Sequence, residues 1–578
     1  MTTLQDRTGT TPAGTPTPPT RRVTGRTVAT RRLAGLLLLV LPLVWAWQRS
    51  VPDGADVVNR GGLSLVGDLL ASALRPQLSA GFLAVVLDAA VTTLTFAALG
   101  TAGALVIGLA GGLVLSDVAW HGRPPAAVRA LRLLVRGVLV AVRSIHELVW
   151  ALLFVSVLGL DPLVAVLAIA VPFGAQTAKV FAETLDGVPS GPLLALRNAG
   201  ARPLPALAYS LFPAATPMLL SYSFYRFECA IRSAVVLGVV GVGGLGQELV
   251  VSLQSRNWDE VWTLVAAVLF LSAAADLWST RLRQDHAVVT CSDWSAGLGK
   301  SRDRSPRPAR SRWARWSAAV VVPGLIVAWL ASDVSLSGLT SARTGELTGR
   351  LLEEMWPPAL PPGGWRSLGD AVQDTVAMAL LAMAVAVAIT AVVGPWAMRT
   401  RRAAMDEHPR PVQRLLRGAF RWAARALLLV LRSVPPTVWA VIALLALFPG
   451  VLPGALALGL YTGGILGRLV AEAWESVDTR PRDALRATGT RGWLASVAAI
   501  VPPSAHHLTT YTLYRLEICI RETAVVGVVG AAGLGRLLGE SLAAFRFPAV
   551  TALLITSLAL SVASEILGRR LRHALRAS

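Results

Sequence analysis

Two copies of one charged motif carry the side chains best suited to chemistry in this sequence. The copies occupy 222–232 and 511–521, and both read Tyr-x-x-Tyr-Arg-x-Glu-x-x-Ile-Arg. On a helix, the Glu and the last Arg lie four residues apart on one face and can form an ion pair. Each copy then keeps a spare guanidinium, Arg226 or Arg515. Two such groups facing each other could bind a tetrahedral oxyanion through paired hydrogen bonds.

The residues of this motif that we expect to contact a ligand, or to line its pathway, come in matched positions. They are Tyr225, Arg226, Glu228, Arg232, Tyr514, Arg515, Glu517 and Arg521. The alternative is that the charges form structural ion pairs that only orient the helix, because buried ion pairs often have no other role.

A glycine-rich run follows each charged motif directly. Glycines at this density allow close backbone approach and left-handed turns, so we expect a gate, although close helix packing through small residues is the alternative. A dinucleotide site is a poor alternative because no βαβ unit surrounds the run. The candidate gate residues are Gly241, Gly244, Gly246, Gly530, Gly533 and Gly535.

A polar segment precedes each charged motif, at 183–200 and 472–489. Pro192 and Pro481 suit a helix start, and Gly200 and Gly489 suit a helix end. We therefore expect a short helix of about two turns at each place, closed by a glycine turn.

The composition shows that apolar spans must position these motifs. The chain has 578 residues, of which 54% are hydrophobic and 15% are charged, and its mean hydropathy is +0.58. A soluble protein carries about 25% charged residues, so a water-soluble enzyme is excluded. Three cysteines cannot form a disulfide framework. The net charge of +20 comes mostly from arginines between apolar runs, which is typical of cytoplasmic loops and not of nucleic-acid binding.

We expect an all-α polytopic membrane protein with about twelve transmembrane helices, six in each half, since a span needs about 20 apolar residues. The stretches at 231–251 and 520–540 are short and glycine-rich, and we expect partial or re-entrant segments there. The expected spans are 33–48, 84–115, 134–158, 162–181, 205–225, 260–278, 316–331, 371–397, 424–448, 452–471, 493–513 and 549–567.

The chain is an internal duplication with an offset of 289 residues. Between 221–246 and 510–535, 14 of 26 positions are identical. Because each half has an even number of expected spans, the halves should share one membrane orientation, which places a pathway at their interface.

Four regions follow from this pattern. We expect a disordered cytoplasmic tail at 1–32, a first half at 33–280, a cytoplasmic linker at 281–315 and a second half at 316–578. Basic residues concentrate in 116–133, 398–425 and the linker, which predicts that these lie inside and that both termini are cytoplasmic.

The two polar segments resemble the coupling-helix signature of permease subunits of binding-protein-dependent ABC importers. That signature is Glu-Ala-Ala, three residues, Gly, nine residues, an aliphatic, one residue and Leu-Pro. Its Glu position is Leu194 in the first half, a departure, and Asp483 in the second. The resemblance implies that the segments dock on an ATPase through Leu194, Ala195, Arg197, Gly200, Asp483, Ala484, Arg486 and Gly489.

The order of motifs from 143 to 250 and from 432 to 540 most resembles phosphonate-type permeases, here with two permease halves fused in one chain. The resemblance implies the type I ABC importer permease fold and import of phosphonate or a related phosphorus oxyanion across a bacterial cell membrane. It also implies three partners: an ATPase dimer, an extracytoplasmic solute-binding protein and membrane lipid. His146 and Pro436 depart from the family pattern.

The chain has no nucleotide site of its own that we recognise. Gly297–Ser301 looks like the end of a phosphate-binding loop, but Trp294 stands where the first Gly should be. We therefore expect no catalytic residue, metal or cofactor in this chain, with ATP and Mg bound by the partner ATPase.

Two other classes stay open at this point. One is a fused permease for another solute, such as thiamine or ferric ion. The other is a proton-coupled secondary transporter, for which Asp88, Glu147 and Asp374 are the few carboxylates within spans. No feature indicates a non-transport assembly factor.

Overall fold

The computed structural model describes residues 40–51, 56–120, 125–286, 312–332, 334, 337–398 and 411–577. The expected tail at 1–32, most of the linker, and Gly297–Ser301 lie outside the described residues. Within them the chain is helical, and the only β feature is an isolated bridge between Val58 and Leu447.

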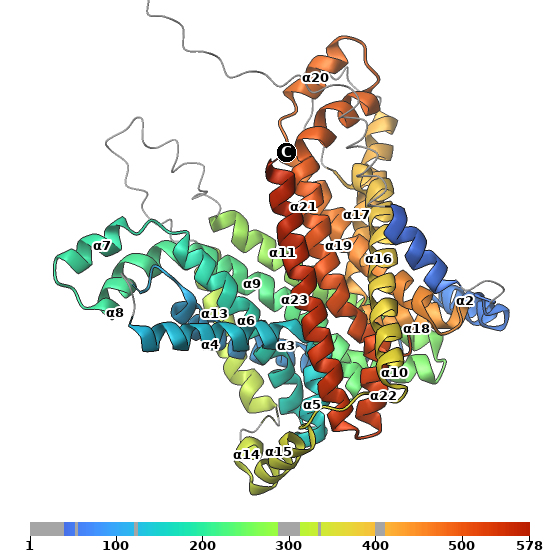
Figure 1. The fold of residues 1–578 in the computed structure, drawn as a ribbon. Helices are drawn as coiled ribbons and strands as arrows, with labels where there is room; N and C mark the ends of the chain where they lie inside the picture. Colours follow the sequence, from blue (N-terminus) through green and yellow to red (C-terminus); the bar gives the residue numbers. More distant parts are fainter. Residues whose placement is uncertain are drawn as a thin grey trace, which may run out of the picture.

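The helices follow one another in the same order in both halves (Figure 1). After a helix at 40–50, the first half contains α2 (Arg60–Ser72), α3 (Ala80–Leu115), α4 (Ala126–Ser144), α5 (Glu147–Leu158), α6 (Pro162–Asp186), α7 (Gly191–Asn198), α8 (Pro203–Ala206), α9 (Phe212–Leu237), α10 (Leu245–Gln254) and α11 (Trp258–His286). The second contains α13 (Arg312–Ala331), α14 (Ser337–Thr340), α15 (Ala342–Glu354), α16 (Gly364–Ala397), α17 (Pro411–Ser433), α18 (Pro436–Ala446), α19 (Val451–Glu475), α20 (Arg480–Ala487), α21 (Gly492–Val528), α22 (Leu534–Ala543) and α23 (Phe547–Ala577).

Six of the described helices are long and apolar enough to cross a membrane by length and composition, namely α3, α6, α11, α16, α19 and α23. Three bent pairs, α4–α5, α9–α10 and α17–α18, bring the number to nine if each is one span. The expected spans at 33–48, 316–331 and 493–513 are not among these nine. The last of them lies in α21, which also carries two adjacent histidines and the second charged motif.

The expected spans at 134–158 and 424–448 are each broken by an elbow. The bend is 95° between α4 and α5 and 93° between α17 and α18. In the second half, Pro435 and Pro436 stand at the break, where proline cannot continue the preceding helix. In the first half, Ile145 is extended, and the His146 side chain accepts a hydrogen bond from the Leu148 amide and caps α5.

Each half is built around one tightly packed helix pair, α3 with α6 and α16 with α19. Small residues permit the close approach. A Cβ on Gly108 would lie 2.4 Å from Thr177, and a Cβ on Gly459 would lie 2.6 Å from Val385. This is the packing by small residues that membrane helices use in place of a hydrophobic driving force.

Helices of each half pack against helices of the other half across the seam. The first half's α2 packs against α18, and the second half's α15 packs against α5. In the same way α11 contacts α17, and α23 contacts α4. These reciprocal contacts are the expected consequence of a duplication with pseudo-two-fold symmetry.

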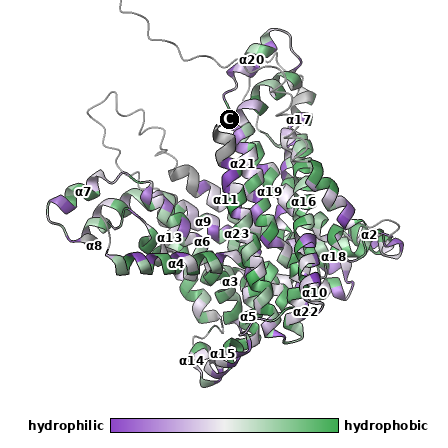
Figure 2. Ribbon diagram, in the orientation of Figure 1, coloured by the Kyte–Doolittle hydropathy of each residue, from purple (hydrophilic) through white to green (hydrophobic). Residues whose placement is uncertain are grey.

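The two short polar helices lie at the ends of separate arms. Figure 1 shows α7 at the left and α20 at the top, and both are far from α10 and α22. Each has eight residues and is followed by a glycine with positive φ, Gly200 at +88° and Gly489 at +86°. The predicted two-turn helix with a glycine turn is therefore confirmed in both halves. Hydrophilic residues mark both arm ends in Figure 2.

The turn between α9 and α10 gives a test of backbone packing. A Cβ on Gly246 would meet the Val235 carbonyl oxygen at 1.8 Å, so Gly246→Ala must separate the two helices. We expect a loss of about 1–3 kcal/mol of stability or more, measured as a lower melting temperature of the purified protein. Gly81→Ala, with no atom within 4 Å of the added Cβ, is the control. Equal melting of the two variants would contradict this packing.

Candidate functional site

A cavity of about 450 Å³ lies at the seam and is lined by both halves. The first half contributes the α4–α5 elbow, α6 and α9, and the second contributes the α17–α18 elbow, α19 and α21. We call it the seam cavity. Of the eight predicted pathway residues, Glu517 is not part of its lining. The other seven line it: Tyr225, Arg226, Glu228, Arg232, Tyr514, Arg515 and Arg521.

Arg226 is the spare guanidinium that the sequence predicts. Its Nε donates to the Tyr222 hydroxyl at 2.8 Å, and its Nη2 donates to the side-chain oxygen of Gln176. The guanidinium also lies over the Phe173 ring, 4.7 Å from its centroid. Within the described residues no carboxylate pairs with it, so a buried positive charge faces the cavity without a counter-ion from the protein.

Arg515 is not spare, and this part of the prediction is wrong. Its Nη2 lies 3.5 Å from a carboxylate oxygen of Glu522 and 3.3 Å from the Thr462 hydroxyl. The reason is a substitution between the halves, because the position equivalent to Glu522 is Ser233. Ser233 instead donates to Glu147 on α5.

The predicted pairs within each motif are present. Arg232 lies 3.6 Å from Glu228, and Arg521 lies 3.5 Å from Glu517. Glu228 also contacts Arg432 of the other half at 3.3 Å. The Nε atoms of Arg232 and Arg515 are buried without an acceptor.

The seam cavity carries an excess of positive charge. Its lining contains seven arginines and four glutamates, with His146 as a further titratable group. Three carboxylates just outside the lining, Asp276, Glu517 and Glu565, pair with four of these arginines, so within the described part of the chain the charge without a carboxylate partner is that of Arg226. Buried donors without acceptors are rare in folded proteins, and here two belong to guanidinium groups. The arrangement is therefore suited to a small anion that accepts several hydrogen bonds.

Two matched ion-pair networks cross the seam beside the cavity, and the sequence reasoning missed both. Asp276 of α11 contacts Arg432 at 3.1 Å and Arg468 at 2.7 Å. Its counterpart Glu565 of α23 contacts Arg143 at 2.7 Å and Lys179 at 3.5 Å.

The 289-residue offset between the repeats could have indicated these networks from the sequence. Each residue of one network lies 289 positions from its counterpart in the other, as the duplication requires. We call these contacts the twin seam networks.

The six candidate gate glycines lie in or beside the turns α9–α10 and α21–α22. Four of them have positive φ: Gly241 at +88°, Gly244 at +80°, Gly530 at +122° and Gly533 at +93°. The turns are fixed by equivalent hydrogen bonds. Thr93 accepts from the Leu245 amide, and Thr375 accepts from the Leu534 amide, both at 2.9 Å. Both turns lie far from α7 and α20 (Figure 1).

The candidate ATPase-contacting residues lie on largely exposed helices. Leu194 is 39% exposed. On α20, the Asp483 carboxylate accepts from Arg482 at 2.8 Å. The remaining members are on or directly after the same two helices: Ala195, Arg197, Gly200, Ala484, Arg486 and Gly489.

The carboxylates suggested for a proton-coupled transporter are dispersed. Asp374 is paired with Arg49 at 2.8 Å, and Asp88 is exposed on α3. Glu147 alone lines the seam cavity. Among the described residues no group of three or more His, Cys, Asp or Glu could hold a metal ion.

Comparison with known proteins gives a family match in both halves. The model of the "binding-protein-dependent transport system inner membrane component" family matches residues 125–285 and 411–577. A phosphate-import permease protein of Mycolicibacterium smegmatis is 30% identical over 490 residues, which are 84% of this chain and 85% of that protein. A phosphite transport system permease protein of Stutzerimonas stutzeri is 31% identical over 245 residues, 42% of this chain and 84% of its own length.

Among solved structures, the MetNI methionine ABC transporter in an inward-facing conformation matches 36% of this chain and 96% of its own, with 19% identity and a TM-score of 0.32.

The twin seam networks can be tested by removing one carboxylate. In Asp276→Asn, the Arg432 side chain, which is 9% exposed, loses its partner in the other half's last helix. Arg432 keeps its contact with Glu228, so the cost should stay below the about 3–5 kcal/mol of a buried charge left with no partner, and we still expect a lower melting temperature. Glu540→Gln breaks a pair whose two side chains are 55% exposed, where the cost should be about 0–1 kcal/mol. Equal effects in both variants would show that Asp276 contributes no more than a surface charge.

Proposed function

The chain belongs to the family of binding-protein-dependent transport system inner membrane components, and we propose that it is the fused permease of an ATP-driven importer for phosphonate or a related phosphorus oxyanion. The two family matches correspond to the two halves. One chain would therefore supply both sides of the pathway, where such permeases usually pair as separate chains.

The observation that carries the proposal is the positive seam cavity. Both halves contribute equivalent helices to it, and its arginines outnumber its glutamates. Guanidinium groups bind phosphorus oxyanions with paired, directed hydrogen bonds. Relatives named for phosphate and phosphite import agree with an anion of this kind.

The same charge argues against the alternative solutes. Thiamine and ferric ion are cations, and the guanidinium of Arg226, which faces the cavity without a carboxylate partner among the described residues, would disfavour them there. A proton-coupled transporter is not supported either, since the family match assigns a different class and Asp374 is already engaged by Arg49.

The energy would come from a separate ATPase dimer that binds ATP and Mg and docks on α7 and α20. These helices lie at the ends of two diverging arms, so an ATPase that closes on ATP would draw the arms together. Alternating access then follows as a rigid-body movement of one half against the other. A solute-binding protein would deliver the anion near α10 and α22, far from the arm ends, and the cell membrane would hold the chain with both termini in the cytoplasm.

The pathway role is tested by replacing the predicted central arginines. We expect Arg226→Ala combined with Arg515→Ala to abolish ATP-dependent uptake of labelled phosphite, phosphate and methylphosphonate in vesicles that contain the complete transporter. Co-purification of the ATPase should persist, because both residues line the seam cavity and neither belongs to α7 or α20. The double Lys variant keeps the charge and should retain part of the uptake. Normal uptake by the alanine variant would exclude the seam cavity as the oxyanion site.

The docking role of α7 is tested at its exposed leucine. A docked ATPase would bury Leu194, so Leu194→Arg should abolish recovery of the ATPase in a pull-down from mild detergent. Leu352→Arg on α15 is the matched control, since Leu352 is 62% exposed at another end of the molecule. Recovery of ATPase with Leu194→Arg equal to that with Leu352→Arg would place the docking surface elsewhere.

A further inference from the structure

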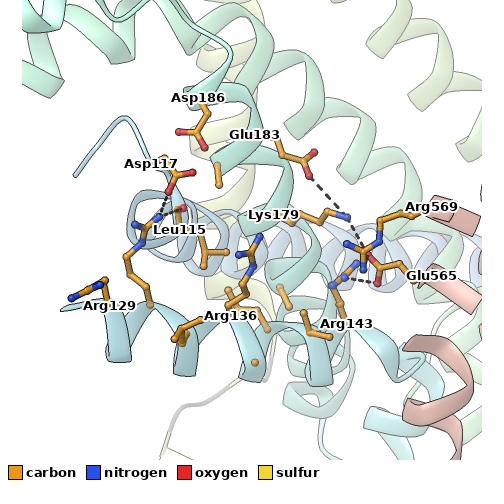
Figure 3. Close-up of a pocket in the computed structure, with 17 residues that line it drawn as sticks. Leu115, Asp117, Arg129, Arg136, Arg143, Lys179, Glu183, Asp186, Glu565 and Arg569 are labelled. Carbon is orange, nitrogen blue, oxygen red and sulfur yellow. Dashed lines mark hydrogen bonds and ion pairs between the residues drawn. The ribbon is translucent and has the colours of Figure 1, made fainter. Parts of the chain in front are cut away.

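A second and larger cavity, of about 960 Å³, lies between α4, α6 and α23. The end of α3 and the segment after it complete its wall, through Leu115 and Asp117. Figure 3 shows Arg136 and Arg143 of α4, Lys179 of α6, and Glu565 and Arg569 of α23 around one space, with Arg129 at the far end of α4 and directed away from them. We call it the α4 basic cavity. Its lining shares only Arg143 with that of the seam cavity.

The cavity owes its charge to one face of α4. Arg129, Arg132, Arg136 and Arg143 follow one another at intervals of three, four and seven residues, so they share a helical face. The other face of α4 is apolar and exposed, with Leu134 at 65% and Val138 at 52% exposure.

Two of the four arginines on this face are already engaged. Arg132 donates to the Val114 and Leu115 carbonyls and pairs with Asp117. Arg143 pairs with Glu565 across the seam.

Arg129 and Arg136 are exposed residues that remain unpaired. Among the described residues neither has an ion-pair or hydrogen-bond partner, and both line the cavity. Figure 3 shows Arg136 directed from α4 into the space between Asp117 and Lys179. The whole lining holds six cationic side chains and four carboxylates, which leaves a charge of +2.

The second half provides a natural comparison, because α4 and α17 are continuous helices with the same 289-residue offset. The counterpart of Arg129 is Gly418. The counterpart of Arg136 is Arg425, which donates to the Ala397 carbonyl and pairs with Glu475 at 2.6 Å. At neither equivalent position of the second half is there an unpaired arginine, so the fold does not require these two unpaired charges.

We propose that the α4 basic cavity binds a phosphate group, either the headgroup of an anionic phospholipid or free inorganic phosphate. Inorganic phosphate carries up to two negative charges and the phosphodiester of phosphatidylglycerol carries one, and both accept hydrogen bonds from guanidinium groups. A lining with a charge of +2 and two unpaired arginines would attract either of them. Leu133 and Leu139 in the lining, and the exposed apolar face of α4, offer a surface for acyl chains.

A ligand bound in this cavity would affect the ion pairs at the seam. Glu565 in the same cavity ties Arg143, Lys179 and Arg569. A bound phosphate would compete with Glu565 for these cations, and so would weaken one of the twin seam networks. The site also adjoins α7, since α6 ends at Asp186 and α7 begins at Gly191.

The test uses the full-length chain in mild detergent, in the Arg226→Ala and Arg515→Ala background so that the seam cavity does not contribute. One arm measures binding of phosphatidylglycerol against phosphatidylcholine by native mass spectrometry. The other measures the shift in melting temperature with inorganic phosphate against chloride at matched ionic strength. Neither readout depends on transport, so failure here is separable from failure of the proposed function.

The decisive variants remove the two unpaired charges. Arg129→Gln combined with Arg136→Gln should weaken binding by at least about tenfold, since the loss of even one charge-assisted hydrogen bond corresponds to a factor of that size. Arg417→Gln combined with Arg421→Gln on α17 removes the same charge from the other half and should leave binding unchanged. A response to phosphatidylglycerol alone assigns the site to lipid, and a response to phosphate alone assigns it to the free ion. No response to either probe, or an equal loss in both double variants, overturns the proposal.

Discussion

The rest of the architecture depends on a buried ion pair made twice across the seam. In each half an arginine at the end of a long amphipathic helix, Arg143 or Arg432, reaches a carboxylate on the last helix of the other half. Such a pair must overcome the cost of removing both charges from water. It therefore contributes more to the registry of the two halves than to their net stability. Because the arginines stand immediately before the elbows, the same contact fixes where the helices turn and where the seam cavity opens.

The duplication produces a site that is symmetric in its frame and asymmetric in its chemistry. The helices, elbows and glycine turns repeat, but the side chains around the two central arginines have diverged. Arg226 rests on Gln176 and aromatic rings, whereas Arg515 is drawn toward Glu522. Fusion into one chain permits this, because a homodimer must keep both sides identical. A single anion bound off the pseudo-two-fold axis would meet a strong donor on one side and a partly neutralised one on the other.

The sequence predicted the repeats, the two short polar helices and most of the spans, because these depend on hydrophobic pattern and on local glycine and proline signals. It also predicted the pairs Glu228–Arg232 and Glu517–Arg521, since a spacing of four residues brings side chains together on any helix. It did not predict the elbow before His146, where a side chain caps the new helix without a proline to mark the break. Contacts such as Asp276 with Arg432 join residues 156 positions apart, and no local rule indicates them. The offset of 289 could have indicated them, because three charged positions in one half have charged counterparts of the same sign in the other.

Arg143 lines both the seam cavity and the α4 basic cavity, and this has a physical consequence. Its guanidinium pairs with Glu565 at 2.7 Å, while its carbonyl accepts from Arg521 of the charged motif at 3.0 Å. A change of charge near Glu565 therefore acts on a residue whose backbone holds a cation of the seam cavity. In the second half, Arg432 contacts both Asp276 and Glu228, so its guanidinium bridges the seam network and the motif directly. The end of α4 is thus connected to the seam cavity through the carbonyl oxygen of Arg143, and the end of α17 through the guanidinium of Arg432. In the proposed transport cycle, a movement of either arm would therefore act on an arginine at the seam.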